Sequence, residues 1–170
     1  MAGGWFSPEG DGNGEDTSDI LAVIRRQSSR QSGLLLGRVT FEDFRGYWPL
    51  QTDDATGITD HLNRVPTYVV SSTLRDPGWE NTMVPPGNMV SEARSLKDAP
   101  GDDLGVTGSI TLVHALFAAG IVDEYRLFQY PVVIGSGRRM FTDGGESRKL
   151  KLVEATPFES GVVLLTYRPA

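Results

Sequence analysis

Cysteine is absent from this sequence of 170 residues, and histidine occurs only as His61 and His114. The absence of thiols excludes disulfides and thiolate metal sites, and two histidines this far apart do not suggest a zinc site. Long apolar runs are also absent. The longest ones, such as Leu34–Leu36 and Val162–Leu165, have the length of a strand and are too short to span a membrane. The sequence also starts without the charged and then apolar residues of a secretory signal. We therefore expect a cytoplasmic protein that binds no metal and no membrane.

Basic residues are missing from the first 19 positions, which hold five acidic residues. The net charge of −6 comes mostly from this segment, because the rest of the chain has 17 acidic and 16 basic residues. A nearly neutral body argues against nucleic acid as a partner, since nucleic-acid binding needs a basic face. Thirteen of the 16 basic residues are arginine, which suits forked recognition of phosphate or carboxylate but also occurs in ordinary compositions.

The order of apolar and turn-forming residues predicts one domain over residues 16–170, after a flexible, acidic and Gly-rich lead-in over residues 1–15. Helical signals predict helices at 20–31, 41–48, 56–63, 90–99 and 109–119. Runs of β-branched and apolar residues predict strands at 34–36, 67–71, 104–107, 123–133, 150–155 and 161–167, with one further short strand between 74 and 86. The fold class is therefore α/β, with three layers, a mostly parallel central sheet and an antiparallel hairpin at its C-terminal edge.

Three of the predicted strands end in residues of similar chemistry. The first ends in Gly37-Arg38-Val39-Thr40, the second in Ser71-Ser72-Thr73, and the third in Thr107-Gly108-Ser109. In an open α/β sheet, ligands bind outside the carboxyl ends of the strands, and the starts of the following helices favour an anion such as phosphate. If the strands are neighbours, the three ends form one groove of polyphosphate size. Glycine, serine and threonine are also the ordinary residues of caps and turns, so each motif alone is weak.

Four blocks of sequence carry a resemblance to a known family: LLLGRVTFEDF, VVSSTL, VTGSITLVHALFAAGIVDEYRL and PVVIGSGRRMF. In this order, over Ile20–Arg168, they resemble the dihydrofolate reductase-like superfamily, and within it the C-terminal reductase domain of the bifunctional riboflavin-biosynthesis deaminase-reductase. The resemblance implies a fold that binds NADPH, with the pyrophosphate at the two glycine turns and the adenosine ribose and its 2′-phosphate after the middle strand. On this chain, the implied cofactor-binding residues are Gly37, Arg38, Thr40, Ser71, Ser72, Thr73, Thr107, Gly108, Ser109 and Ile110.

The substrate side of the predicted site rests on fewer residues. Dihydrofolate reductases use a carboxylate on the first helix to hold and protonate the substrate, and the resemblance implies Asp19 for this role, with Asp16 as the alternative. Asp19 is also well suited to be no more than the N-cap of its helix. Trp5, Phe44 and Trp48 are candidates for the wall of a ring pocket. Phe44 and Trp48 lie four residues apart, however, and this spacing is equally typical of core residues.

These observations predict an NADPH-dependent oxidoreductase that transfers a hydride to a small heteroaromatic or imine-like substrate, similar to dihydrofolate or a riboflavin precursor, and forms a homodimer. In the family, an apolar central strand precedes a loop resembling Gly4-Trp5-Phe6-Ser7-Pro8, and we expect this first strand to be missing here. Its absence favours the alternative of a nucleotide- or ligand-binding module without turnover. A third alternative is a dimeric structural protein without a ligand. The segment Gly135–Arg139 suits either an anion site or a hairpin loop.

Overall fold

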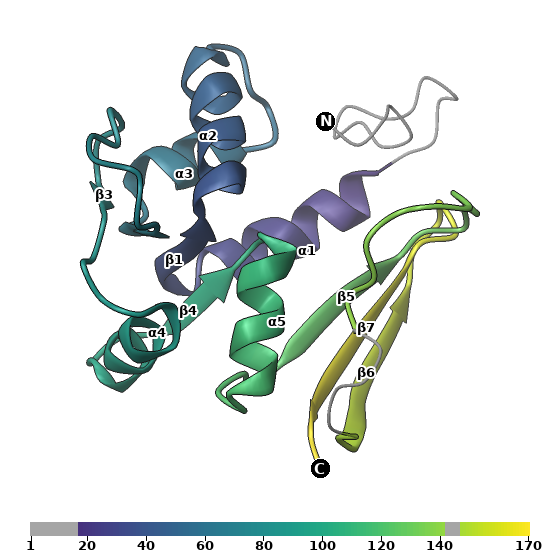
Figure 1. The fold of residues 1–170 in the computed structure, drawn as a ribbon. Helices are drawn as coiled ribbons and strands as arrows, with labels where there is room; N and C mark the ends of the chain where they lie inside the picture. Colours follow the sequence, from purple (N-terminus) through teal and green to yellow (C-terminus); the bar gives the residue numbers. More distant parts are fainter. Residues whose placement is uncertain (1–16, 142–146) are drawn as a thin grey trace. The chain divides into compact units, whose positions relative to one another are not determined.

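The structure is a computed structural model that describes residues 17–141 and 147–170 (Figure 1). These residues belong to two compact units. The described part of the parallel unit comprises residues 25–122 and 138–141, and that of the antiparallel unit comprises residues 17–24, 123–137 and 147–170. The lead-in over residues 1–15 lies outside the described residues, so the division of the chain into this segment and one domain stays a prediction.

A four-stranded sheet with the order β3-β2-β1-β4 forms the centre of the parallel unit. β1 pairs in parallel with β2 on one side and with β4 on the other, and its last five residues are buried. Such a continuous apolar run is typical of a strand that is covered on both faces. The strands are β1 (Gln31–Gly37), β2 (Thr67–Val70), β3 (Thr82–Met83) and β4 (Asp103–Val106), and the helices are α2 (Arg38–Tyr47), α3 (Ile58–Arg64), α4 (Met89–Asp98), α5 (Ile110–Ala118) and the 3-10 helix η1 (Trp48–Leu50).

Helices cover both faces of the parallel sheet. Successive leucines of β1 point to opposite faces, and each face packs against different helices. Leu34 and Leu36 belong to a buried cluster with Phe41 of α2 and Leu62 of α3. Leu35 belongs to a second cluster, which is formed with residues of α4 and α5. The parallel unit therefore has the three layers that the sequence predicted.

The antiparallel unit contains β5 (Tyr125–Gln129), β6 (Leu150–Pro157) and β7 (Val163–Pro169) in the order β5-β7-β6. Ile20, in the first half of α1 (Ser18–Ser28), packs on this sheet against Phe158, Val162 and Leu164. The predicted C-terminal hairpin is present as β6 and β7, and the fold class is confirmed. The hairpin belongs to a separate sheet, however, because β7 pairs along its length with β5 on one side and β6 on the other.

The helix predicted at 20–31 ends at Ser28, and the strand predicted at 34–36 already begins at Gln31. Two further predicted boundaries are wrong for identifiable reasons. β5 ends at Gln129 and not at Val133, because Pro131 has no N–H for a sheet ladder, and residues 131–139 are all exposed. α2 begins at Arg38 and not at Phe41, because Gly37 ends β1 and serves directly as the N-cap of the helix. The strand therefore passes into the helix without a loop.

Candidate functional site

Three strand ends meet at one edge of the parallel sheet. β1 lies between β2 and β4, and the register pairs Gly37 with Val70 and Leu35 with Val106. The polar motifs that the sequence singled out follow these strands directly. The condition on which the predicted groove depends, that the three strands are neighbours, is therefore met.

The first turn of α2 contributes backbone donors to this edge. Gly37 has extended backbone angles, with φ −80° and ψ 153°, and α2 follows at once. Arg38, Val39 and Thr40 therefore form the first helical turn, where backbone N–H groups have no acceptor within the helix. The positive end of the helix dipole lies at the same place, so an anion is favoured beside Gly37.

A second turn connects β4 to α5. Gly108 has φ +78°, in the left-handed region that glycine adopts without strain, and its peptide bond to Ser109 is cis. Ser109 is the N-cap of α5, and its Oγ accepts a hydrogen bond of 3.4 Å from the backbone N–H of Leu112. Thr107 is exposed, and Ile110 is the first residue of the helix.

The two glycine turns are in contact with each other. A Cβ atom at Gly37 would collide with the Oγ of Ser109, and a Cβ atom at Gly108 would lie 3.0 Å from the Oγ1 of Thr40. The starts of α2 and α5 can therefore approach this closely only because both positions are glycine. Two helix N-termini and the hydroxyls of Thr40 and Ser109 thus converge at one edge of the sheet.

The third motif forms a tight turn after β2. The Oγ of Ser71 accepts hydrogen bonds from the backbone N–H groups of Thr73 and Leu74, at 3.1 and 2.9 Å. Ser71 therefore stabilises the turn, which is the ordinary role of serine in caps and turns that the sequence left open. Ser72 and Thr73 are exposed beside it.

Arg38, the expected phosphate ligand, already has an acidic partner. Its Nη1 lies 2.7 Å from an Oε2 of Glu42, one helical turn further along α2, and the two side chains are 42% and 37% exposed. Glu42 is not among the residues predicted for the site. The signal that could have revealed it is the spacing of four residues between opposite charges on a predicted helix.

The candidate proton donor Asp19 lies at the start of α1, in the antiparallel unit. Its Oδ1 accepts a hydrogen bond of 2.7 Å from the backbone N–H of Ile20, and its Oδ2 accepts one of 3.1 Å from that of Glu159. These contacts tie the helix start to the turn between β6 and β7. The alternatives for the substrate side, Asp16 and Trp5, lie outside the described residues.

The aromatic candidates on α2 and η1 are half-buried. Phe44 and Trp48 pack against the buried cluster around Leu34 and Leu36, with their ring centroids 6.5 Å apart and their planes nearly perpendicular. Tyr47 also contacts Trp48, at 5.0 Å between centroids, and is 41% exposed. These positions fit the core role that the spacing of Phe44 and Trp48 suggested, and a role as a pocket wall stays a prediction.

The segment Gly135–Arg139 is not a hairpin loop. It lies between β5 and β6, and these strands pair with β7 and not with each other. The carbonyl of Arg139 lies 3.0 Å from the Nε2 of His114 on α5. His114 is thus satisfied by a local contact, and an anion-binding role of the segment stays a prediction.

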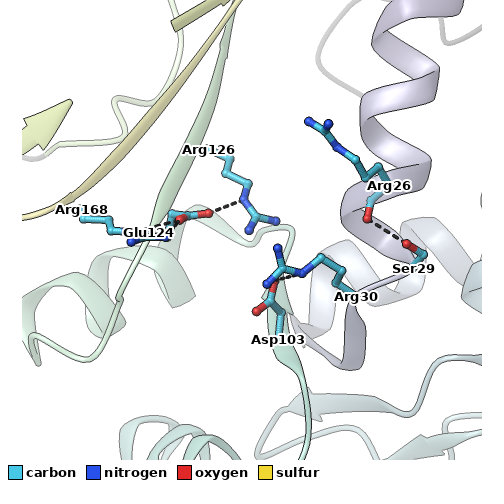
Figure 2. Close-up of polar contacts among 7 residues, drawn as sticks. All are labelled: Arg26, Ser29, Arg30, Asp103, Glu124, Arg126 and Arg168. Carbon is cyan, nitrogen blue, oxygen red and sulfur yellow. Dashed lines mark hydrogen bonds and ion pairs between the residues drawn. The ribbon is translucent and has the colours of Figure 1, made fainter. Parts of the chain in front are cut away.

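Other charged groups make polar contacts within each unit (Figure 2). Glu124 accepts hydrogen bonds from Arg126 and Arg168, at 2.6 and 2.9 Å, which outweigh the effect of burial and lower the pKa of its carboxyl. Arg30 lies 3.9 Å from Asp103, at the end of the parallel sheet opposite to the glycine turns.

In the described part of the chain, no three potential metal ligands lie together. No described helix combines the length and the apolar character that crossing a membrane requires.

The sequence matches the family model of the RibD C-terminal domain over residues 4–164, so the chain belongs to this family. An uncharacterised protein of Bacillus subtilis, YyaP, is 32% identical over 136 residues, which cover 79% of this chain and 72% of that protein.

Solved structures share the fold at lower identity. A putative riboflavin biosynthesis protein from Shewanella has a TM-score of 0.69 at 19% identity, over 94% of this chain and 82% of the other. A diaminohydroxyphosphoribosylaminopyrimidine deaminase/5-amino-6-(5-phosphoribosylamino)uracil reductase from Thermotoga maritima has a TM-score of 0.61 at 16% identity, over 96% of this chain and 52% of the other. The shared fold agrees with the resemblance of the four sequence blocks to the reductase domain of the riboflavin-biosynthesis deaminase-reductase.

Proposed function

We propose that this protein is a cytoplasmic, NADPH-dependent oxidoreductase that transfers a hydride to a small heteroaromatic or imine-like substrate. The observation that carries the proposal is the contact between the two glycine turns, where Gly37 meets Ser109 and Gly108 meets Thr40. Two helix starts that are brought together in this way are suited to the two phosphates of a dinucleotide. Membership of the RibD C-terminal domain family supports the same proposal.

In this proposal, the pyrophosphate of NADPH is held by the backbone N–H groups at the starts of α2 and α5, together with the hydroxyls of Thr40 and Ser109. Arg38 adds a positive charge beside Gly37. The exposed hydroxyls of Ser72 and Thr73 lie after the neighbouring strand β2, where they are suited to the ribose of the adenosine. The nicotinamide supplies the hydride when it is bound, and the protein orients it.

Preference for NADPH over NADH is part of the proposal. The turn after β2 carries hydroxyls and Arg75 but no carboxylate before Asp76, whose Oδ1 is occupied by the backbone N–H of Gly78 at 3.0 Å. A carboxylate near the ribose would favour a 2′-OH, whereas hydroxyls and arginine suit a 2′-phosphate. We expect the affinity for NADPH to exceed that for NADH at least tenfold in isothermal titration calorimetry. Equal or tighter binding of NADH would contradict this preference.

The substrate class is proposed to be similar to dihydrofolate or a riboflavin precursor. The similar structure from Thermotoga maritima is described as a uracil reductase, which supports a substrate with a pyrimidine-type ring. The test is the loss of NADPH absorbance at 340 nm in the presence of dihydrofolate or a ribosylaminopyrimidine. Turnover with one of these compounds supports a reductase, and the absence of saturable NADPH binding up to millimolar concentration would exclude it.

One observation favours the second candidate, a nucleotide-binding module without turnover. Both carboxylate oxygens of Asp19 accept backbone hydrogen bonds, so this residue has a structural role that needs no chemistry. Saturable NADPH binding without oxidation by any substrate of the proposed class would support this candidate over the reductase.

A further inference from the structure

The loop between β2 and β3, residues 71–81, is attached to α2 by an arginine. Arg45 lies on α2, is half-buried, and donates a hydrogen bond of 2.8 Å from its Nη1 to the backbone carbonyl of Pro77. Its guanidinium also lies over the ring of Phe41, with the central carbon 5.6 Å from the ring centroid. Such a cation–π contact favours one orientation of the planar guanidinium. The arginine that holds the loop is therefore itself held by its own helix.

Neighbouring contacts fix the same part of the loop. The ring of Trp79 lies 6.1 Å from that of Phe41 between centroids, and its Nε1 donates a hydrogen bond of 2.9 Å to the Oδ1 of Asn63 on α3. Gly78 lies beside the guanidinium, since a Cβ atom at this position would be 3.7 Å from the Nη1 of Arg45. The side chains of Arg45, Phe41, Asn63 and Trp79 together form what we call the loop anchor.

The exposed polar side chains of the loop come before the loop anchor in the chain. Ser72, Thr73 and Arg75 are exposed, and Leu74 between them packs against the buried cluster around Leu34. These three polar side chains are the ones that we expect to face the ribose and its 2′-phosphate. Their position relative to the start of α2, where we expect the pyrophosphate, therefore depends on the loop anchor.

We propose that Arg45 is a positioning residue that sets the preference of this protein for NADPH over NADH. It acts through the loop, because its Nη1 is bound to Pro77 and its guanidinium plane lies on Phe41. By fixing the loop on α2, it sets the separation between the pyrophosphate site and the groups that face the 2′-phosphate. A loop that is ordered before the ligand arrives loses less conformational entropy on binding. This inference rests on the proposed function and deepens it.

Calorimetric titration of the full chain with NADPH and with NADH tests the proposal. Arg45→Met keeps an apolar stem but loses the donor, so it should weaken NADPH binding about tenfold and NADH binding by less than about twofold. The two effects differ because only NADPH has the 2′-phosphate that the loop faces. Arg45→Lys keeps the charge and a donor for Pro77, and should recover most of the preference. Equal weakening of both cofactors in Arg45→Met would overturn the proposal, and so would an unchanged ratio of the two affinities.

Two further variants separate positioning from a simple effect of charge. Arg25→Met removes an arginine that donates to the carbonyls of Ala55 and Thr56 in a different loop, and it should leave the ratio of the two affinities unchanged. Asn63→Ala weakens the loop anchor at Trp79 without a change of charge, and should lower the ratio about threefold. A ratio that falls equally in Arg45→Met and Arg25→Met, but not in Asn63→Ala, would show that Arg45 acts through its charge alone and would overturn the proposal.

Hydrogen–deuterium exchange without any cofactor measures the loop anchor itself. Peptides that cover residues 72–79 should exchange faster in Arg45→Met than in the wild type, and peptides that cover residues 51–57 should do so in Arg25→Met. Unchanged exchange over residues 72–79 in Arg45→Met would show that this arginine does not hold the loop, and the proposal would fail. A wild-type chain that binds neither cofactor would refute the proposed function, whereas a preference that survives Arg45→Met would refute this inference alone.

Discussion

Arg38 and Glu42 show how a single pair of residues decides what the candidate site can bind. The guanidinium lies at the start of α2, where it can reach a phosphate, but it is held by a carboxylate at 2.7 Å. Both groups are partly exposed, so the ion pair contributes only about 0–1 kcal/mol. A phosphate offers Arg38 a stronger charge-assisted bond, worth about 1.5–3 kcal/mol. We therefore expect Arg38 to exchange Glu42 for the cofactor when NADPH binds.

The first prediction concerns this exchange. Arg38→Gln should weaken NADPH binding about ten- to a hundredfold, because one charge-assisted contact is lost. Glu42→Gln should tighten binding up to about fivefold, because Arg38 no longer has to leave its partner. Calorimetric titration measures both changes. Asp43→Asn, an exposed acidic neighbour on the same helix, is the matched control and should change little. Unchanged affinity in Arg38→Gln would remove Arg38 from the site.

Asp54 is a second residue whose local chemistry has a measurable consequence. Its Oδ2 accepts a hydrogen bond of 2.8 Å from the backbone N–H of Thr59 in the first turn of α3, and its Oδ1 accepts hydrogen bonds from the backbone N–H and the Oγ1 of Thr56. Burial alone would raise the pKa of the carboxyl, but these hydrogen bonds outweigh it and lower the pKa to about 2.

The second prediction follows from this capping role. Asp54→Ala should lower the free energy of unfolding by about 1–2 kcal/mol, whereas Asp53→Ala, at an exposed neighbouring position, should change it by less than about 0.5 kcal/mol. Urea unfolding at pH 7 measures both. Similar losses in the two variants would show that Asp54 does not cap α3.

The pH dependence of stability gives an independent check on Asp54. Because its pKa in the folded chain is depressed, its contribution is fully present above about pH 4 and is lost as the pH falls towards 2. After allowance for solvent screening, this contribution is about 1 kcal/mol. Asp54→Asn keeps an acceptor for the backbone but cannot titrate. Its unfolding free energy should therefore fall less than that of the wild type between pH 4 and pH 2.5.

At the scale of elements, the direct passage from β1 into α2 positions the site. Gly37 has ordinary extended angles, so alanine fits its backbone, and the conflict is purely steric, with the side chain of Ser109. Gly46, on the same helix, has open space around it. The two glycines therefore form a matched pair for one substitution.

The third prediction uses this pair. Gly37→Ala should weaken NADPH binding at least tenfold and cost about 1–3 kcal/mol of stability, because the two turns must move apart. Gly46→Ala should keep the affinity and stabilise the chain by up to about 1 kcal/mol, since alanine is the better helix former. Titration and thermal melting separate the two effects. Gly37→Ala with wild-type affinity would mean that the contact between the turns does not matter for the ligand.

The elements themselves could largely be predicted from the sequence, because their signals are local. Pro66 and Pro100 lie between neighbouring elements, and α5 lies within one residue of its predicted bounds. Two of the errors arose where a residue serves two elements, as Gly37 does, or where proline ends a strand in an apolar run, as Pro131 does. The separate antiparallel sheet was not foreseen, since strand pairing is a property of distant segments and leaves no local signal.

At the scale of the whole molecule, the sequence indicated which residues follow the strand ends but not which of them touch. The contact of Gly37 with Ser109 joins residues more than 70 positions apart, so neither motif alone could predict it. The family resemblance supplied the cofactor, and membership of the RibD C-terminal domain family agrees with it. On the substrate side, Trp5 and Asp16 stay predictions.

The central claim is that NADPH binds where the starts of α2 and α5 meet. Hydrogen–deuterium exchange of the full chain, with and without saturating NADPH, tests this location most directly. We expect slower exchange in peptides that cover Gly37–Phe41 and Gly108–Leu112, because their first-turn N–H groups gain an acceptor. Peptides from β6 should exchange at the same rate in both samples. Saturable binding that leaves the two helix starts unprotected would contradict the account.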